Sequence, residues 1–301
     1  MRASVLIPTF RRPESFMRAA RSVFAQSGVR DIELVAIDNS PEGSARHAFE
    51  ALAAEAPIPF SFVHAPDPGV AHARNAALSL ARGRYVAWLD DDEEARPGWL
   101  AALIRVREQT GAQSVFGPVR PAAPLTTPHA DFFEALYARA GAPYSGVING
   151  AYGIGNSLQP RAMFEGPTPF DAAANETGGE DDRLFSSWME AGAQFAWAHD
   201  AVVTEHLDLA RLTLAYGLKR AFAYGQGPCE TAWARRDYAS LARHMGVGAA
   251  QAAAYGAGAV LSLPKPRRAL KLAERAARGA GKVLWFRPQR FYGATLARQT
   301  A

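Results

Sequence analysis

The alternation of apolar runs with helical segments in the first 111 residues constrains the fold of this chain more than any other feature. Short apolar runs predict four strands, at residues 4–7, 32–37, 60–63 and 85–89. Apolar residues at helical spacing predict four helices, at residues 13–27, 44–55, 70–81 and 97–109. Near-continuous apolar strands that alternate with helices form parallel sheets covered on both faces. We therefore expect an α/β fold with a mostly parallel central sheet flanked by helices.

Polar side chains follow three of the predicted strands. Thr9 follows the first strand, Asp38 ends the second, and the last runs directly into Asp90, Asp91 and Asp92. In open parallel sheets, ligands bind beyond the carboxyl ends of the strands. We therefore expect these side chains to line one crevice.

Several protein classes are excluded by short patterns. Residues 8–13, after the first strand, contain no glycine, so the dinucleotide-binding fingerprint is absent, and no phosphate-binding G-K-[ST] loop exists. The glycines at 150, 153 and 155 lie beyond the strand–helix units and indicate a bend or a close backbone approach. A single cysteine, Cys229, allows no internal disulfide and favours a reducing compartment. No apolar run reaches the ~18–20 residues of a membrane span, and the first residues show no signal-peptide pattern. We expect a soluble, cytoplasmic protein.

The charge is divided unevenly along the chain. The net charge is +4, yet residues 265–301 hold ten Lys and Arg residues against one acid, so the rest of the chain is net negative. This division predicts a catalytic domain at residues 1–208 and a mostly helical extension at residues 209–301 with a basic, aromatic tail.

The acidic cluster after the fourth strand suits a metal-assisted phosphate site. A phosphate group is negative, so carboxylates such as Asp90 and Asp92 attract it only through a cation, and Mg²⁺ or Mn²⁺ takes such oxygen ligands. The alternative is a solvated acidic turn that caps the helix beginning near Pro97.

A family resemblance is carried by six short segments, at residues 5–13, 22–26, 34–40, 69–76, 89–92 and 178–182. In this order, over the first two thirds of the chain, they resemble the motifs of the family 2 inverting glycosyltransferases. The resemblance implies the GT-A fold, a nucleotide-sugar donor and a divalent cation, Mn²⁺ or Mg²⁺. A UDP-sugar is the expected donor because such donors are frequent in the family.

The resemblance also implies roles for individual residues. It places the donor against Pro8, Thr9, Phe10, Arg11, Asp38, Arg74, Asp90 and Asp91. It makes Asp92 the metal ligand, with His206 completing the metal shell. For four of these residues an ordinary role stays open: a core ring for Phe10, a turn for Asp38, a surface ion pair for Arg74 and a structural hydrogen bond for His206.

The implied catalytic carboxylates precede an apolar-faced helix at residues 183–191. By resemblance, Asp181 is the base that deprotonates the acceptor hydroxyl in a single in-line displacement with inversion, and Glu180 orients the acceptor or the loop. A helix N-terminus favours the ionised carboxylate, and plain helix capping is the alternative. Asn156 is expected on the acceptor side, or as a turn residue.

The absence of other motifs reduces the number of activities that fit the sequence. Processive synthases carry a Q-x-x-R-W motif and membrane helices, which this chain lacks, so a single addition to a glycan or lipid-linked acceptor is favoured. A sugar-phosphate nucleotidyltransferase needs a glycine-rich loop after the first strand, which is also missing. A non-catalytic glycan-binding or scaffolding relative is the third alternative.

The C-terminal third predicts helices at residues 209–227 and 268–278, followed by interleaved aromatic and basic residues at 283–292. That composition suits peripheral contact with the anionic inner face of a membrane. The alternative is a basic tail packed on the acidic body. No nucleic-acid motif accompanies it, so no nucleic-acid partner is expected.

Overall fold

The structure, a computed structural model, describes residues 1–287 apart from 125 and 176–178. It divides into two compact units. The described part of the first unit is Met1–Arg120 with Ala138–His206, and that of the second is Pro121–Tyr137 with residues 207–287. The domain boundary expected after residue 208 remains a prediction; the packing assigns residues 121–137 to the second unit.

An eight-stranded sheet forms the centre of the first unit, in the order β3-β2-β1-β4-β9-β6-β10-β8. Its strands are β1 (Ala3–Thr9), β2 (Ile32–Asp38), β3 (Phe60–His64), β4 (Tyr85–Trp88), β6 (Ser114–Phe116), β8 (Gly146–Ile148), β9 (Ser157–Pro160) and β10 (Phe195–Trp197). The first four are mutually parallel, as are β6 and β10, whereas β9 and β8 run antiparallel to their neighbours. The predicted α/β class with a mostly parallel sheet is confirmed.

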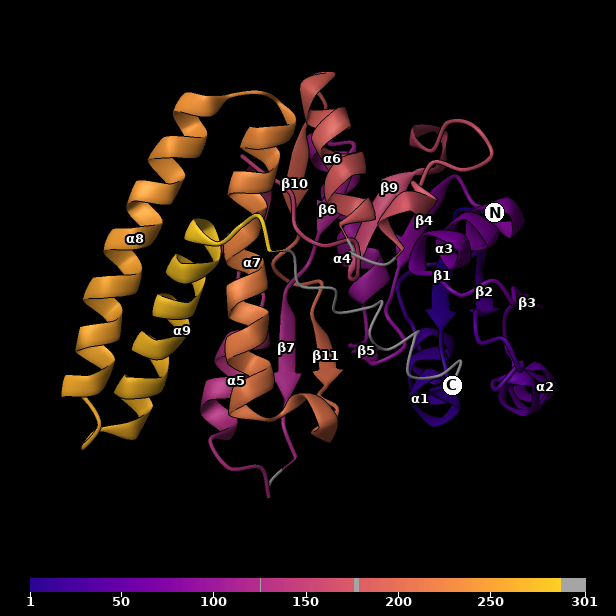
Figure 1. The fold of residues 1–301 in the computed structure, drawn as a ribbon. Helices are drawn as coiled ribbons and strands as arrows, with labels where there is room; N and C mark the ends of the chain where they lie inside the picture. Colours follow the sequence, from indigo (N-terminus) through magenta and orange to yellow (C-terminus); the bar gives the residue numbers. More distant parts are fainter. Residues whose placement is uncertain (125, 176–178, 288–301) are drawn as a thin grey trace. The chain divides into compact units, whose positions relative to one another are not determined.

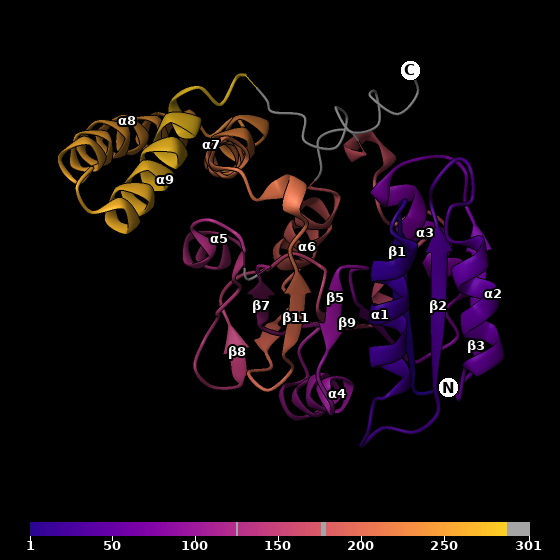
Figure 2. The ribbon, with the colours of Figure 1, turned by 90° about the horizontal axis from the view of Figure 1, so that it is seen from below.

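Helices cover both faces of this sheet. One face carries α1 (Pro13–Phe24), α2 (Arg46–Glu55) and α4 (Trp99–Thr110), and the other carries α3 (Val70–Leu80) and α6 (Glu180–Glu190). Figure 2 shows α4 and α6 on opposite sides of the strands. Short 3₁₀ helices lie at Arg161–Met163 and Ala172–Ala174.

A second, three-stranded sheet has the order β5-β11-β7. Its strands are β5 (Glu93–Ala95), β7 (Val119–Ala122) and β11 (Val203–His206). The antiparallel pairing of β11 with β5 places Glu205 opposite Glu93. It therefore brings the end of β11 beside the acidic cluster that follows β4.

The second unit is helical, as the sequence predicts. Its helices are α5 (Ala130–Tyr137), α7 (Leu214–Ala234), α8 (Tyr238–Leu261) and α9 (Pro266–Val283), with a 3₁₀ turn at Leu209–Arg211 (Figure 1). The helix expected at residues 209–227 begins only at Leu214, because Thr213 caps it by accepting a hydrogen bond from the main-chain nitrogen of Tyr216 at 3.2 Å. Among the described residues, no helix combines the length and apolar character that crossing a bilayer requires.

Glycines let the helices of the second unit approach closely. A Cβ atom added at Gly281 of α9 would lie 2.0 Å from the carbonyl oxygen of Phe222 in α7. One added at Gly279 would lie 2.7 Å from the carbonyl oxygen of Gly248 in α8. These contacts are backbone to backbone, so neither side can yield by rotating a side chain.

Gly281→Ala is expected to lower the free energy of unfolding by about 1–3 kcal/mol, the usual cost of overpacking. Urea unfolding measures it. The matched control is Gly246→Ala in α8, where nothing lies within 4 Å of the added Cβ. The control is expected to raise stability by roughly 0.5–1 kcal/mol, because alanine favours helix over glycine. Equal effects of the two substitutions would contradict the packing described.

Candidate active site

The carboxyl ends of β1 and β4 lie side by side, because these strands are adjacent and parallel. Thr9, at the end of β1, donates a hydrogen bond from its hydroxyl to Oδ2 of Asp91 at 2.7 Å. Asp38 ends β2 and is the register partner of Thr9. The residues that follow these strands therefore gather at one edge of the sheet.

Arg12 neutralises part of the acidic cluster. Its Nη1 lies 2.9 Å from Oδ2 of Asp92 and 3.3 Å from Oδ1 of Asp91. Burial, together with the neighbouring charge of Asp92, raises the pKa of Asp91 to about 6, even though Arg12 and the Thr9 hydrogen bond act in the opposite direction. The cluster thus holds more negative charge than its surroundings stabilise.

Asp90 and Glu93 extend this excess of negative charge. The main-chain nitrogen of Asp90 donates to Oε2 of Glu93 at 3.1 Å, and Glu93 is buried. Burial raises the pKa of Asp90; Arg74 opposes the shift, and the charges of Asp92 and Asp181 add to it. Burial also raises the pKa of Glu93 well above its ordinary value. A bound cation would relieve this repulsion.

Glu180 begins α6 and forms a buried ion pair with Arg74 of α3. Arg74 is 7% exposed and Glu180 is 4% exposed. Burial raises the pKa of Glu180, the Arg74 charge opposes this, and the Asp181 charge adds to it. The alternative of a surface ion pair for Arg74 is therefore incorrect, since the pair is buried and ties α3 to the first turn of α6.

Asp181 lies in the first turn of α6. Its Oδ2 accepts a hydrogen bond from the main-chain nitrogen of Ile154 at 2.9 Å, and its Oδ1 accepts one from that of Asp182 at 3.0 Å. Gly178, the first residue of the motif, lies outside the described residues. The predicted helix at 183–191 starts three residues earlier, so the acids are part of it.

Residues 153–155 connect the two groups of carboxylates. A Cβ added at Gly155 would lie 2.3 Å from Oδ2 of Asp90, and one added at Gly153 would lie 3.6 Å from Oδ2 of Asp181. Arg139 fixes the segment by donating from Nη1 to the carbonyl oxygen of Gly155 at 2.6 Å. Of the glycines at 150, 153 and 155, for which a bend or a close approach was expected, Gly155 shows the close approach, whereas nothing lies within 4 Å of a Cβ added at Gly150. Asp90 and Asp181 therefore flank one three-residue segment.

Gly155→Ala is expected to reduce turnover by about 10²-fold, because the added methyl group displaces Asp90 and a displacement near 1 Å has effects of this size. Steady-state kinetics with a saturating donor measures it. Gly246→Ala, remote from Asp90 in sequence and with open space around the new methyl group, is the control. Unchanged turnover in Gly155→Ala would contradict the contact.

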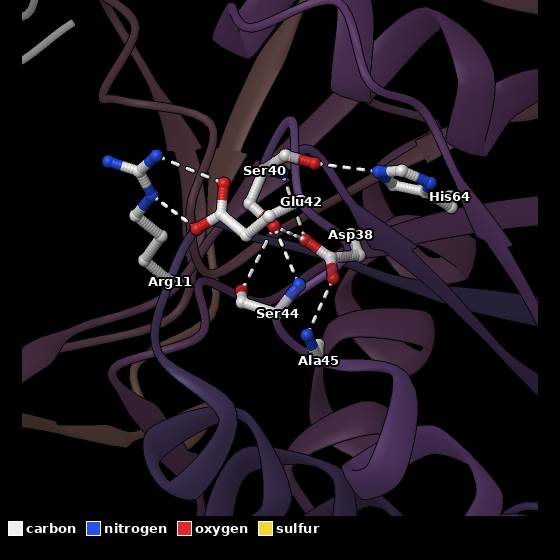
Figure 3. Close-up of polar contacts among 7 residues, drawn as sticks. All are labelled: Arg11, Asp38, Ser40, Glu42, Ser44, Ala45 and His64. Carbon is white, nitrogen blue, oxygen red and sulfur yellow. Dashed lines mark hydrogen bonds and ion pairs between the residues drawn. The ribbon is translucent and has the colours of Figure 1, made fainter. Parts of the chain in front are cut away.

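Asp38 forms a turn, which is the alternative role that the sequence allowed for it. Its Oδ1 accepts hydrogen bonds from the nitrogen and hydroxyl of Ser40 at 2.9 and 2.7 Å, and its Oδ2 accepts one from the nitrogen of Ala45 at 2.6 Å (Figure 3). His64 contacts the carbonyl oxygen of Ser40 at 2.7 Å. This carboxylate fixes the loop between β2 and α2. Contact with a nucleobase stays a prediction.

The turn after β1 contains the other residues that are expected to bind the nucleotide-sugar donor. Pro8 and Phe10 are both partly buried, and the Arg11 guanidinium lies 5.3 Å from the centre of the Phe10 ring. Arg11 also forms an ion pair with Glu42 at 2.5 Å (Figure 3). The Phe10 ring is thus not enclosed in the core, and it retains surface for a ligand.

His206 lies next to Asp92. Its main-chain nitrogen donates to the carbonyl oxygen of Asp92 at 2.8 Å, and its Nε2 lies 2.9 Å from Oε2 of Glu94. His206 is the last residue of β11. Across the described chain, no three His, Cys, Asp or Glu side chains form a complete metal-binding group. A cation shared with a diphosphate needs only one or two carboxylates, so these residues fit it.

Asn156 is a structural residue, and its expected place on the acceptor side is corrected. It has no exposed surface and adopts a left-handed φ of 53°. Its Oδ1 accepts from Nε1 of Trp99 at 2.7 Å, and its Nδ2 donates to the carbonyl oxygens of Pro118 and Ala201 at 2.8 and 2.9 Å. Both side-chain polar atoms are engaged inside the protein, which leaves neither for an acceptor.

The sequence did not identify two residues that lie at the candidate site, Arg12 and Arg139. Arg12 could have been found, because it directly follows Arg11 in the turn after β1, where basic side chains suit a diphosphate. Arg139 gives no local signal. It reaches the site only through its hydrogen bond to Gly155 and through its charge, which opposes the raised pKa of Asp90.

Comparison with known proteins agrees with this geometry. A family model described as glycosyl transferase family 2 matches residues 4–130. The succinoglycan biosynthesis protein ExoM of Rhizobium meliloti (strain 1021) is 31% identical over 281 residues, which are 91% of this chain and 89% of that protein. The succinoglycan biosynthesis protein ExoO of the same strain is 34% identical over 110 residues, 36% of this chain and 30% of that protein.

Among solved structures, the mannosyltransferase PcManGT from Pyrobaculum calidifontis, in complex with GDP-Man and Mn²⁺, is similar with a TM-score of 0.64. The match covers 95% of this chain and 88% of that one at 20% identity, which shows a common fold, the GT-A fold. The family match includes the edge formed by Thr9, Asp38 and the acidic cluster, and the likeness to ExoM extends over nearly the whole chain. The chain belongs to glycosyl transferase family 2.

Proposed function

We propose that this protein is an inverting, metal-dependent glycosyltransferase that adds one sugar from a nucleotide-diphosphate donor to an acceptor hydroxyl during polysaccharide biosynthesis. One observation carries the proposal: Asp90 and Asp181, from segments far apart in the sequence, flank residues 153–155. The names of the two Rhizobium meliloti relatives, both succinoglycan biosynthesis proteins, support a glycan as the acceptor, and we extend the proposal to a lipid-linked glycan.

Asp181 is the proposed general base. The Ile154 and Asp182 N–H groups hold one oxygen each, which fixes the orientation of the carboxylate. Each oxygen keeps a further lone pair, and one of these accepts the proton of the acceptor hydroxyl as that hydroxyl attacks the anomeric carbon. Attack opposite the departing diphosphate inverts the configuration at that carbon.

Glu180 and Arg74 hold the base in place. Their buried ion pair anchors the first turn of α6 to α3, so the position of Asp181 depends on it. Arg74 lies near enough to Asp90 to oppose the rise in its pKa, and we assign it a second role in neutralising the diphosphate.

Asp92 is the proposed ligand of the divalent cation, with His206 beside it and Asp90 and Asp91 supporting the donor. When bound, the cation neutralises charge that develops on the departing nucleoside diphosphate. The structure of PcManGT with Mn²⁺ supports this choice of metal. Arg12, already in contact with Asp92, is placed to bind the same phosphates.

The nucleotide is assigned to the turn after β1 and to the start of the loop after β2. Thr9 and Pro8 lie beneath the nucleotide, and the Phe10 ring and Arg11 contact the base and the phosphates. Asp38 fixes the loop after β2 that borders the base. UDP is the default nucleotide.

The test is release of nucleoside diphosphate from a panel of UDP- and GDP-sugars with Mn²⁺, with and without glycan acceptors. We expect release that chelation with EDTA abolishes, and a product whose anomeric proton in ¹H NMR shows the opposite configuration to the donor. Transfer with retained configuration would refute inversion. Failure to release diphosphate from any donor would favour the scaffold alternative.

A further inference from the structure

The turn between α8 and α9 exposes large apolar side chains to solvent. Val260, Leu261 and Leu263 are 65%, 84% and 69% exposed. Scattered exposed leucines are ordinary on protein surfaces, but three within four positions form a patch, and such patches mark interaction sites. Figure 1 shows this turn at the free end of the hairpin formed by α8 and α9, away from the turn that joins α7 to α8.

Positive charge borders this patch. Lys265, Arg267, Arg268 and Lys271 follow within eight residues of Leu263, all are exposed, and the next acid along the chain is Glu274. Arg267 forms an exposed ion pair with Asp131 at 3.0 Å, which leaves a clear local excess of cations.

The helix that leads into the patch carries no charge near it. Residues 245–264 contain no Asp, Glu, Lys, Arg or His, and Val247 on α8 is also exposed. A soluble surface helix normally presents charged residues to water. An apolar surface beside a row of cations is the composition of segments that lie in the interface of an anionic bilayer.

We propose that the turn formed by residues 260–263, with the cations at 265–271, docks this protein onto a bilayer of anionic phospholipids. Val260, Leu261 and Leu263 enter the interface, and the lysine and arginine side chains reach the lipid phosphates while their stems stay among the apolar groups. The proposed membrane contact is therefore made by the turn between α8 and α9. The sequence alone instead predicts contact through the aromatic and basic tail. The inference does not depend on the proposed sugar transfer.

The test is flotation of the full chain with vesicles of phosphatidylcholine, alone or mixed with phosphatidylglycerol at about three to one. We expect at least ~10-fold more bound protein on the mixed vesicles, with binding reduced by salt. The variant Val260→Ser/Leu261→Ser/Leu263→Ser should lose at least ~10-fold of that binding. The matched control Tyr144→Ser/Met189→Ser/Leu209→Ser, which alters exposed apolar residues elsewhere, should bind as the unaltered protein does.

A second variant tests the charges alone. Lys265→Glu/Arg268→Glu leaves the apolar residues in place, and acids in the first turn of α9 are compatible with the helix. It should abolish the preference for phosphatidylglycerol. Thermal unfolding of each variant checks that it is folded.

Two results would overturn the proposal. One is equal flotation of the unaltered protein and the apolar-turn variant. The other is that the unaltered protein does not float and sediments as a dimer, whereas the apolar-turn variant sediments as a monomer. That result would assign the patch to contact with a second copy of the chain.

Discussion

Asp181→Asn is expected to lower kcat by roughly 10²–10⁴-fold, the usual effect of removing a positioned general base. The asparagine is nearly isosteric and keeps an oxygen for the Ile154 hydrogen bond, so the local fold should persist. The KM for the donor should change little, because Asp181 acts on the acceptor. Steady-state rates of nucleoside diphosphate release, with both substrates varied, measure both constants.

The matched control for this prediction is Asp182→Asn. Asp182 is the next residue of the same helical turn, and its side chain is exposed to solvent. We expect Asp182→Asn to change kcat by less than about tenfold, because the Asp182 carboxylate neither binds residues 153–155 nor takes part in the Arg74–Glu180 ion pair. If both variants lost activity equally, the effect would come from the negative charge at this helix start, and Asp181 would not be the base.

Breaking the buried Arg74–Glu180 pair is expected to destabilise the protein by about 3–5 kcal/mol, because one unpaired charge remains buried. Glu180→Gln and Arg74→Met should both show this loss in urea unfolding. The double variant should lose less than the sum of the two, since it leaves no uncompensated charge.

An exposed ion pair on the same helix serves as the control. Arg183 pairs with Asp171 at 2.7 Å, and both side chains are more than half exposed. Arg183→Met should cost less than about 1 kcal/mol, as is usual for surface ion pairs. A similar loss for both pairs would mean that Arg74 and Glu180 are accessible to water in solution.

The fold of the first unit can be predicted from the sequence because its strands β1, β2 and β4 are almost entirely buried. Each parallel strand is a nearly unbroken apolar run that ends at a polar residue, as β4 does before Asp90. Strand ends in such sheets converge, so the positions of Thr9, Asp38 and the acidic cluster follow from the strand pattern alone.

The helix α8 is harder to predict because its sequence has no amphipathic period. Its buried side packs through glycines such as Gly248 against α9, and from residue 245 onward its outer side carries alanines and other uncharged residues. Without a contrast between two faces, periodicity gives no signal.

Contacts between residues distant in sequence could not be predicted from local patterns such as hydrophobic periodicity. Arg74 and Glu180 are 106 positions apart, and neither segment signals that the other covers it. The three hydrogen bonds that bury Asn156 and the approach of Arg139 to Gly155 likewise depend on tertiary packing.

The central claim is that the acids after β4 bind the diphosphate through a cation while Asp181 serves the acceptor. Isothermal titration of the preferred nucleoside diphosphate with Mn²⁺ tests it in the unaltered protein, Asp92→Asn and Asp181→Asn. We predict that Asp92→Asn loses the Mn²⁺-dependent part of the affinity, whereas Asp181→Asn binds as the unaltered protein does. Unchanged Mn²⁺-dependent affinity in Asp92→Asn would contradict the account.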